Sequence, residues 1–256
     1  MRAIPIFITI YLVATFLPLN IFAESKLYMV IVGVADYPGD ESDLNLTVKD
    51  ATTISALYKA NAKKTNGNCK TVLLTDKQAT VNSIILNMQN LYSYANKEDI
   101  IALFFSGHGC EEGFCAYDKI LSFDKIKQCM SLFKCNSKMI FADACFSGMI
   151  RENRNEKKFN IENIRKSFLL QGKSIMLFMS SRSNEYSYEN YSMNNGFFTN
   201  ALQFGLRGKA DINKDRIITA SELFKYVSKN VAKKSNGKQH PVMWGNFSND
   251  MPVIMW

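Results

Sequence analysis

Histidine is scarce in this chain, which has only 2 among its 256 residues. The two are His108 and His240, and none of the 6 cysteines forms a CxxC pair. Structural zinc sites draw on cysteine pairs and histidines at such short spacings. The sequence therefore argues against zinc and leaves the histidines to be considered for acid–base chemistry.

The chain also lacks a recognisable nucleic-acid-binding pattern, although its formal net charge is +8. Its 31 lysines and arginines are scattered, and aromatic residues are not interleaved with them in any known module. The charge therefore indicates a solvated surface with a general attraction to acidic surfaces. We predict no nucleic-acid partner.

Beyond the N-terminus, no apolar run is long enough to cross a membrane. At the N-terminus, Arg2 precedes an apolar stretch over 3–19, and the small residue Ala23 precedes a polar pair. This layout predicts a secretory signal peptide, residues 1–23. The alternative is an uncleaved anchor helix, because the run approaches the roughly 20 residues that span a bilayer. We expect an exported protein, secreted or periplasmic, with no stable membrane insertion after cleavage and a membrane anchor without it.

Apolar, β-branched runs alternate with amphipathic segments along the rest of the chain. The runs have the character of strands buried on both faces: 27–34, 71–74, 100–107, 138–144 and 174–181. Helically spaced apolar residues lie between them or follow them: 48–58, 84–91, 123–130 and 223–231. The alternation predicts one α/β domain, 24–256, with a mostly parallel sheet and helices on both faces.

Two reactive residues follow strands of this predicted sheet. His108 comes after the run 100–107, within SGHG, and Cys145 comes after 138–144, within DACFSG. In open α/β sheets, ligands bind beyond the carboxyl ends of the strands. If the two strands are neighbours, the side chains can face one another as a Cys/His dyad. The alternative is a packed cysteine and a core histidine, the usual role of each taken alone.

These motifs resemble those of a known family. SGHG and DACFSG are similar to the two catalytic signatures of the caspase-like cysteine peptidases, in the metacaspase and bacterial branch. VGVADYP and VKDA resemble the family's N-terminal part, and NGFFTNALQFGLRGKADINKD with ITASELFKYV resembles its C-terminal part. The resemblance covers about 27–245. It implies a cysteine endopeptidase and a three-layer α-β-α sandwich whose mostly parallel central sheet has about six strands.

The resemblance also implies roles for individual residues. Cys145 would be the nucleophile and His108 the general acid/base, and the backbone N–H groups of Gly109 and Cys145 would form the oxyanion hole. Asp143 matches the metacaspase position that selects arginine or lysine, and a carboxylate does attract a cation. Its alternative role is to accept hydrogen bonds from loop amides. Asp36 is a candidate for a second acidic residue that lines the same substrate pocket, a second acidic wall.

Further substrate-binding candidates are Ser180 and Ser181, which match the family's substrate-binding loop. The expected partners are protein or peptide substrates with basic residues. The chain itself carries such residues in a basic loop at 148–166, after the nucleophile. We therefore hypothesise self-processing in this loop, whose alternative role is a solvated connection.

This chemistry requires no cofactor. The sequence leaves open whether the protein binds calcium. The segment after SGHG carries few aspartates for a calcium-dependent metacaspase. A second segment matches the EF-hand spacing: Asp211, Asn213, Asp215 and Glu222. However, Arg216 stands where an EF-hand needs glycine, and Thr219 with Glu222 equally matches a helix capping box.

Two other functions are compatible with the sequence. One is an inactive caspase-fold module that binds partners, which is disfavoured because Cys145 and His108 are both present. The other is a peptidase of related fold, similar to legumain or gingipain. Such an enzyme would share the His-Gly motif and the catalytic cysteine. It would lack the C-terminal segment that contains GLRGKAD and ELFKYV.

The remaining cysteines offer local pairs for disulfides, which an exported chain permits. The pairs closest in sequence are Cys110 with Cys115 and Cys129 with Cys135. If Cys145 is a working thiol, at least one other cysteine has no partner within the chain.

Overall fold

A computed structural model describes most of the chain. It covers residues 25–39, 43–64, 67–145, 165, 168, 175–182, 189–190 and 195–255, and at Cys145, Glu189 and Asn190 the backbone only. The predicted signal peptide and most of the basic loop lie outside these residues. Among the helices that are described, none has the length and apolar character needed to cross a membrane.

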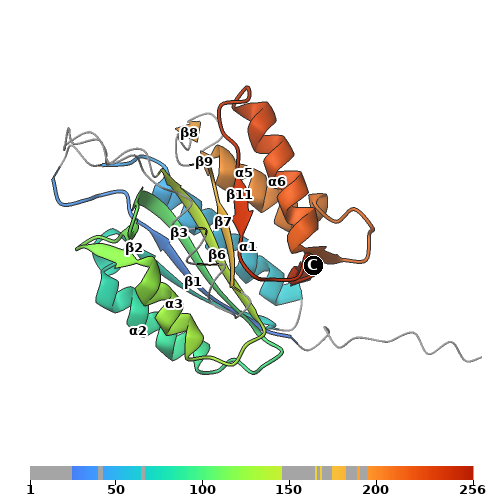
Figure 1. The fold of residues 1–256 in the computed structure, drawn as a ribbon, viewed down its shortest axis with the longest axis horizontal. Coiled ribbons are helices and arrows are strands. Elements are labelled where there is room, and N and C mark those ends of the chain that lie inside the picture. Colours follow the sequence, from blue (N-terminus) through green and yellow to red (C-terminus); the bar gives the residue numbers. More distant parts are fainter. Residues whose placement is uncertain are drawn as a thin grey trace, which may run out of the picture.

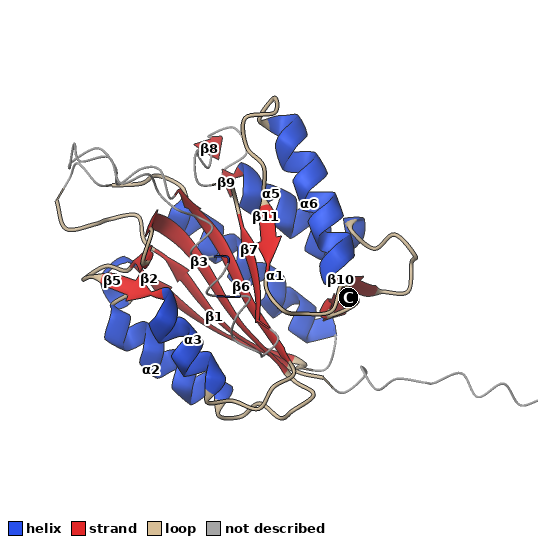
Figure 2. Ribbon diagram, in the orientation of Figure 1, coloured by secondary structure: helices blue, strands red, loops and turns tan. Residues whose placement is uncertain are grey.

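A central sheet organises the molecule (Figures 1 and 2), with the strand order β11-β7-β6-β3-β1-β2. Its strands are β1 (Leu27–Gly33), β2 (Cys69–Thr75), β3 (Ile100–Cys110), β6 (Ser137–Cys145), β7 (Ile175–Met179) and β11 (Val242–Trp244). The pairs β2–β1, β1–β3, β3–β6 and β6–β7 are parallel, and β11 joins β7 antiparallel. The prediction of a mostly parallel sheet of about six strands is confirmed.

Helices cover both faces of the sheet (Figure 2). On one face lie α2 (Val81–Tyr92) and α3 (Phe123–Ser131), and on the other lie α1 (Thr47–Lys64), α5 (Phe197–Phe204) and α6 (Ala220–Lys234). The predicted helical segments are thus confirmed as α1, α2, α3 and α6.

The central strand β1 shows why the sheet strands are apolar throughout. Val30 and Val32 pack with α2 and α3, whereas Met29 and Ile31 pack with α1, α5 and α6. Successive side chains of a strand point to opposite faces. Since both faces are covered, every residue of β1 is buried.

Short elements complete the fold. An antiparallel arm beside β3 is formed by β4 (Gly113–Cys115) and β5 (Ile120–Ser122). Two small sheets pair β10 (Ile217–Thr219) with β12 (Pro252–Met255) and β8 (Glu189–Asn190) with β9 (Asn195–Gly196). A 3₁₀ turn, Asp76–Gln78, follows β2, and a π-helical turn, Gly205–Lys209, follows α5. Of these, β4 and β9 reach the candidate site.

Candidate active site

The two residues of the predicted dyad occupy partner positions on adjacent strands. In the parallel pair β3–β6, Ser106 pairs with Asp143 and His108 pairs with Cys145. His108 is partly exposed, and the His108–Cys145 pair is the last of this ladder, at the carboxyl end of β6. The condition for a dyad, neighbouring strands, is therefore confirmed. The side chain of Cys145 lies outside what the structure describes, so its catalytic role stays a prediction.

Tyr37, on the loop after β1, holds the backbone of His108. Its hydroxyl accepts a hydrogen bond from the His108 N–H at 2.9 Å and donates one to the Cys115 carbonyl at 3.0 Å. The two rings lie with centroids 4.9 Å apart. Burial raises the pKa of Tyr37 above its ordinary value, so the phenol stays protonated and able to donate. Sequence reasoning missed this residue, although it follows a strand at the reactive edge.

Gly107 makes this contact sterically possible. A Cβ at position 107 would lie 2.6 Å from the Tyr37 hydroxyl oxygen and 2.9 Å from a ring carbon of Phe105. Neighbouring Gly109 pairs with Phe114 in the β3–β4 ladder. The oxyanion-hole role of Gly109 and Cys145 stays a prediction.

Asp143, two residues before Cys145, is buried and bonded to α5. Its Oδ2 accepts hydrogen bonds from the N–H and the hydroxyl of Thr199, at 3.1 and 2.7 Å. Thr199 lies in the first turn of α5, where a negative charge is favourable because the helix N–H groups are unpaired there. Asp143 therefore has the hydrogen-bonding role that the sequence left open, and its specificity role is taken up below.

A second buried carboxylate, Asp50 of α1, lies beside Asp143. It accepts hydrogen bonds from the Asn195 side chain (2.8 Å), the Gly196 N–H (3.1 Å) and the Ser106 hydroxyl (3.1 Å). Burial, and then repulsion by Asp143, raise the pKa of Asp50 well above its usual value. We call Asp50 and Asp143 the acidic pair.

Gly196 lies where the acidic pair converges. A Cβ at position 196 would lie 2.8 Å from Oδ2 of Asp143 and 3.5 Å from Oδ2 of Asp50. A Cβ there would press on Asp143 and would be in ordinary van der Waals contact with Asp50. Sequence reasoning missed Asp50, whose signal was an acidic residue inside the apolar helical stretch 48–58.

The predicted second acidic wall, Asp36, has a different environment. It lies exposed on the loop after β1, and its N–H donates to Oδ1 of Asp76 at 3.0 Å. The carboxylate that the structure places beside Asp143 is that of Asp50. A contact between Asp36 and substrate stays a prediction.

Ser180 and Ser181, after β7, are both buried. The Ser180 hydroxyl donates to the carbonyl of Ala144 at 3.3 Å, and its own carbonyl accepts a hydrogen bond from the Gln239 side chain at 2.9 Å. Ser180 thus holds the backbone just before Cys145. A substrate-binding role for the two serines stays a prediction.

The calcium candidates form a hydrogen-bonded turn before α6. The Asp211 carboxylate accepts hydrogen bonds from the N–H groups of Lys214 and Arg216, at 2.7 and 3.0 Å. Thr219 and Glu222 form the predicted capping box. The other two candidates are bonded to each other: Asn213 and Asp215. Across the part of the chain that the structure describes, no cluster of three or more His, Cys, Asp or Glu could hold a metal ion. A calcium requirement stays untested.

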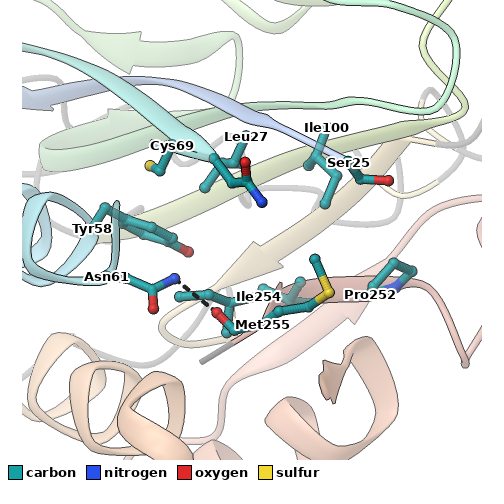
Figure 3. A pocket seen from close by; sticks show the side chains of 11 residues that line it. Ser25, Leu27, Tyr58, Asn61, Cys69, Ile100, Pro252, Ile254 and Met255 are labelled. Carbon is teal, nitrogen blue, oxygen red and sulfur yellow. Dashed lines mark hydrogen bonds between the residues drawn. The ribbon is translucent and has the colours of Figure 1, made fainter. Parts of the chain in front are cut away.

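A small pocket lies at the opposite end of the sheet (Figure 3). It has a volume of about 40 Å³ and is lined by the first residues of β1, β2 and β3, by Tyr58 of α1 and by β12. The Asn61 side chain donates to the Met255 carbonyl at 2.8 Å beside it. Because the dyad positions lie at the carboxyl ends of the strands, this pocket is separate from the candidate active site.

Comparisons with known proteins agree with this geometry. The family model of the caspase domain matches residues 26–251. The structure is similar to the protein GSU0716 from Geobacter sulfurreducens, with a TM-score of 0.64 and 19% identity over 90% of this chain and 99% of that one. It is also similar to caspase-1 from Spodoptera frugiperda, with a TM-score of 0.61 and 16% identity over 89% of each chain. No curated protein matches the sequence.

Proposed function

Because the chain belongs to the caspase-domain family, we propose that it is a cysteine endopeptidase that cleaves after arginine or lysine. The observation that carries the proposal is the pairing of His108 with Cys145 across β3 and β6. Sheet register alone brings these two residues together. The family also favours this prediction over the legumain- or gingipain-like alternative.

The mechanism follows from the chemistry of the two side chains. His108 takes the thiol proton of Cys145, and the thiolate attacks the peptide carbonyl. The N–H groups of Gly109 and Cys145 stabilise the oxyanion. His108 then protonates the leaving amine, and water hydrolyses the thioester. Tyr37 supports these steps by fixing the His108 backbone through the 2.9 Å hydrogen bond.

The acidic pair supports the preference for basic residues. Asp143 directly precedes Ala144 and Cys145, and Asp50 adds a second buried carboxylate. Two neighbouring carboxylates repel each other, and a guanidinium or ammonium group between them would relieve that repulsion and donate hydrogen bonds. An acidic substrate residue would be rejected by the same charges.

The main experiment measures turnover by the purified protein on fluorogenic peptides ending in arginine, lysine, aspartate or asparagine, with and without calcium. We expect cleavage after arginine and lysine, and none by the Cys145→Ala variant. Cleavage after aspartate would contradict the specificity. Absence of turnover on all four peptides would favour the partner-binding module. The calcium arm tests the cofactor question directly.

A second variant separates the two roles of Asp143. The Asp143→Asn change removes the charge but keeps an oxygen to accept the hydrogen bond from Thr199. If Asp143 selects the substrate, kcat/KM falls about 100-fold or more for peptides ending in arginine or lysine, while kcat/KM for peptides ending in asparagine does not fall. If Asp143 only holds α5, all peptides lose activity equally.

Self-processing in the basic loop 148–166 is part of the proposal. Within it, Arg165 is described and exposed. A peptidase that selects arginine and lysine would find its own substrates there. Mass spectrometry should find wild-type protein cut within 148–166 and Cys145→Ala protein intact. Intact wild-type protein that hydrolyses peptides would refute self-processing alone.

We also propose export of the protein, on the basis of the N-terminal apolar run at 3–19. Cell fractionation followed by sequencing of the mature N-terminus tests it. A chain that begins at residue 24 outside the cytosol is expected, and an intact N-terminus in the membrane fraction would support the anchor instead.

A further inference from the structure

Two cysteine thiols meet beside the candidate active site. Cys110 ends β3 and pairs with Gly113 of β4, and Cys115 ends β4. Since alternate residues of a strand share a face, Cys115 lies on the same face as Gly113 and therefore as Cys110. The thiol of Cys115 donates a hydrogen bond to the sulfur of Cys110. The two cysteines are thus diagonal neighbours on one face of the β3–β4 pair.

The two thiols differ in exposure and in acidity. Cys110 is partly exposed and Cys115 is buried. The hydrogen bond from Cys115 lowers the pKa of Cys110 to about 6, and backbone N–H groups of Glu112 and Gly113 add to this against the effect of burial. The same hydrogen bond, together with burial, raises the pKa of Cys115. An accessible thiolate next to a buried thiol is the arrangement of an attacking and a resolving cysteine.

The remaining described thiols provide the contrast. Burial raises the pKa of Cys69 to about 12 and that of Cys129 to about 11, and it also raises the pKa of Cys135. Thiols of this kind react slowly because little thiolate is present at neutral pH. Among the five cysteines whose side chains are described, a lowered pKa is thus confined to Cys110 of the pair at the site.

We propose that Cys110 and Cys115 form a reversible disulfide by exchange with a low-molecular-weight disulfide, and that this bond slows turnover at the neighbouring dyad. The thiolate of Cys110 attacks one sulfur of the small disulfide and releases one thiolate. Cys115 then gives its proton to that thiolate and attacks Cys110, releasing the second. The second thiolate takes up the proton that Cys110 released when it ionised. Counted from the two thiols, the protein loses two electrons and two protons, and the small disulfide becomes two thiols.

The contacts around the pair explain the effect on turnover. Gly109, a proposed oxyanion donor, lies between His108 and Cys110, and Tyr37 bonds the backbones of Cys115 and His108 together. Diagonal residues of an antiparallel pair have Cα atoms roughly 7–8 Å apart, whereas disulfides span roughly 4.4–6.8 Å. Closing the bond therefore shifts backbone by about 1 Å, a displacement that can cost about 100-fold in rate.

Formation of the bond is tested without reference to activity. The Cys145→Ala chain, which lacks the predicted nucleophile, is incubated with oxidised glutathione, alkylated and digested without reduction by a glutamate-specific protease. Because Glu111 and Glu112 lie between the two cysteines, the digest separates them unless they are bonded. We expect a linked peptide joining Cys110 to Cys115. Glutathione adducts alone, or a link that involves Cys129 or Cys135 instead, would overturn the proposal.

The effect on turnover rests on the proposed function and is tested second. Oxidised wild-type protein should lose about 100-fold in kcat/KM and recover with dithiothreitol, and Cys129→Ala should respond as wild type does. The Cys115→Ser variant, which cannot close the bond, should lose much less. Equal losses in wild type and Cys115→Ser would place the oxidation at another thiol and refute regulation. The reduced protein can also prove to have no turnover although the linked peptide is found. That result would refute the proposed function but would still support formation of the disulfide.

Discussion

The two ends of the central sheet differ sharply in chemistry, although the same strands connect them. At the carboxyl ends, Ser106 and Asp143 are buried polar residues within a network of hydrogen bonds. At the amino ends, Leu27 and Ile100 line a small, largely apolar pocket, where the buried hydroxyl of Tyr58 has no hydrogen-bond partner. Burying polar groups is costly unless they are bonded. The buried polar groups at the carboxyl ends have partners, whereas the Tyr58 hydroxyl at the amino ends has none.

The largest effect should come from removing the predicted nucleophile. We expect Cys145→Ala to lower kcat by about 10⁴-fold or more, because the covalent step is lost. The matched control is Cys69→Ala at the amino end of β2, which should keep full turnover. Turnover by both proteins is measured on arginine peptides. Similar losses in the two variants would remove the functional contrast between the two ends.

A smaller effect should follow from Tyr37→Phe, which leaves the His108 N–H and the Cys115 carbonyl without their shared partner. We expect kcat to fall about 10- to 100-fold through misplacement of His108, and the free energy of unfolding to fall by about 1–3 kcal/mol. Steady-state kinetics and urea unfolding measure the two effects. Unchanged kinetics with lost stability would make Tyr37 purely structural.

The acidic pair should appear in the pH dependence of stability. Burial and repulsion raise the pKa of Asp50 in the folded state, so the folded protein holds this proton more tightly than the unfolded chain. The free energy of unfolding therefore falls as pH rises from about 4, by up to about 1.4 kcal/mol per pH unit, until Asp50 is ionised in the folded state.

The Asp50→Asn variant should flatten this dependence, because its side chain does not titrate. The exposed Asp215 provides the matched control, and Asp215→Asn should keep the wild-type slope. Urea unfolding across the pH range measures all three proteins. A wild-type slope in Asp50→Asn would mean that another group titrates.

The smallest effect is expected at the amino end. Tyr58→Phe removes a buried hydroxyl that has no hydrogen-bond partner, so the free energy of unfolding should rise by about 1 kcal/mol. Turnover should not change, because the residue is far from the dyad. Thermal unfolding and peptide assays test both statements. A loss of stability would show that the hydroxyl has a partner in solution.

Much of this fold could be predicted because the sheet strands are buried on both faces. The strands β1, β3 and β6 appear in the sequence as continuous apolar runs, and parallel strands bring their carboxyl ends to one edge. Those facts placed both His108 and Cys145 at the reactive edge, and only the structure shows that β3 and β6 are neighbours. The family resemblance then supplied their expected roles.

The supporting contacts of the site could not be predicted in the same way. Tyr37 reaches His108 only because β1 lies beside β3, and apolar patterns do not determine the order of strands in a sheet. Asp50 meets Asp143 only because α1 packs against the face that also carries β9 and α5. Such contacts join residues far apart in the chain, so local periodicity carries no signal for them.

The convergence of two carboxylates on Gly196 has a consequence for how this protein can vary. Asp50 and Asp143 come from distant segments, yet both lie against the backbone of one residue. Substitutions at these three positions are therefore energetically coupled rather than additive. A change at one of them alters the effect of changes at the others, so the three positions are expected to vary as a unit.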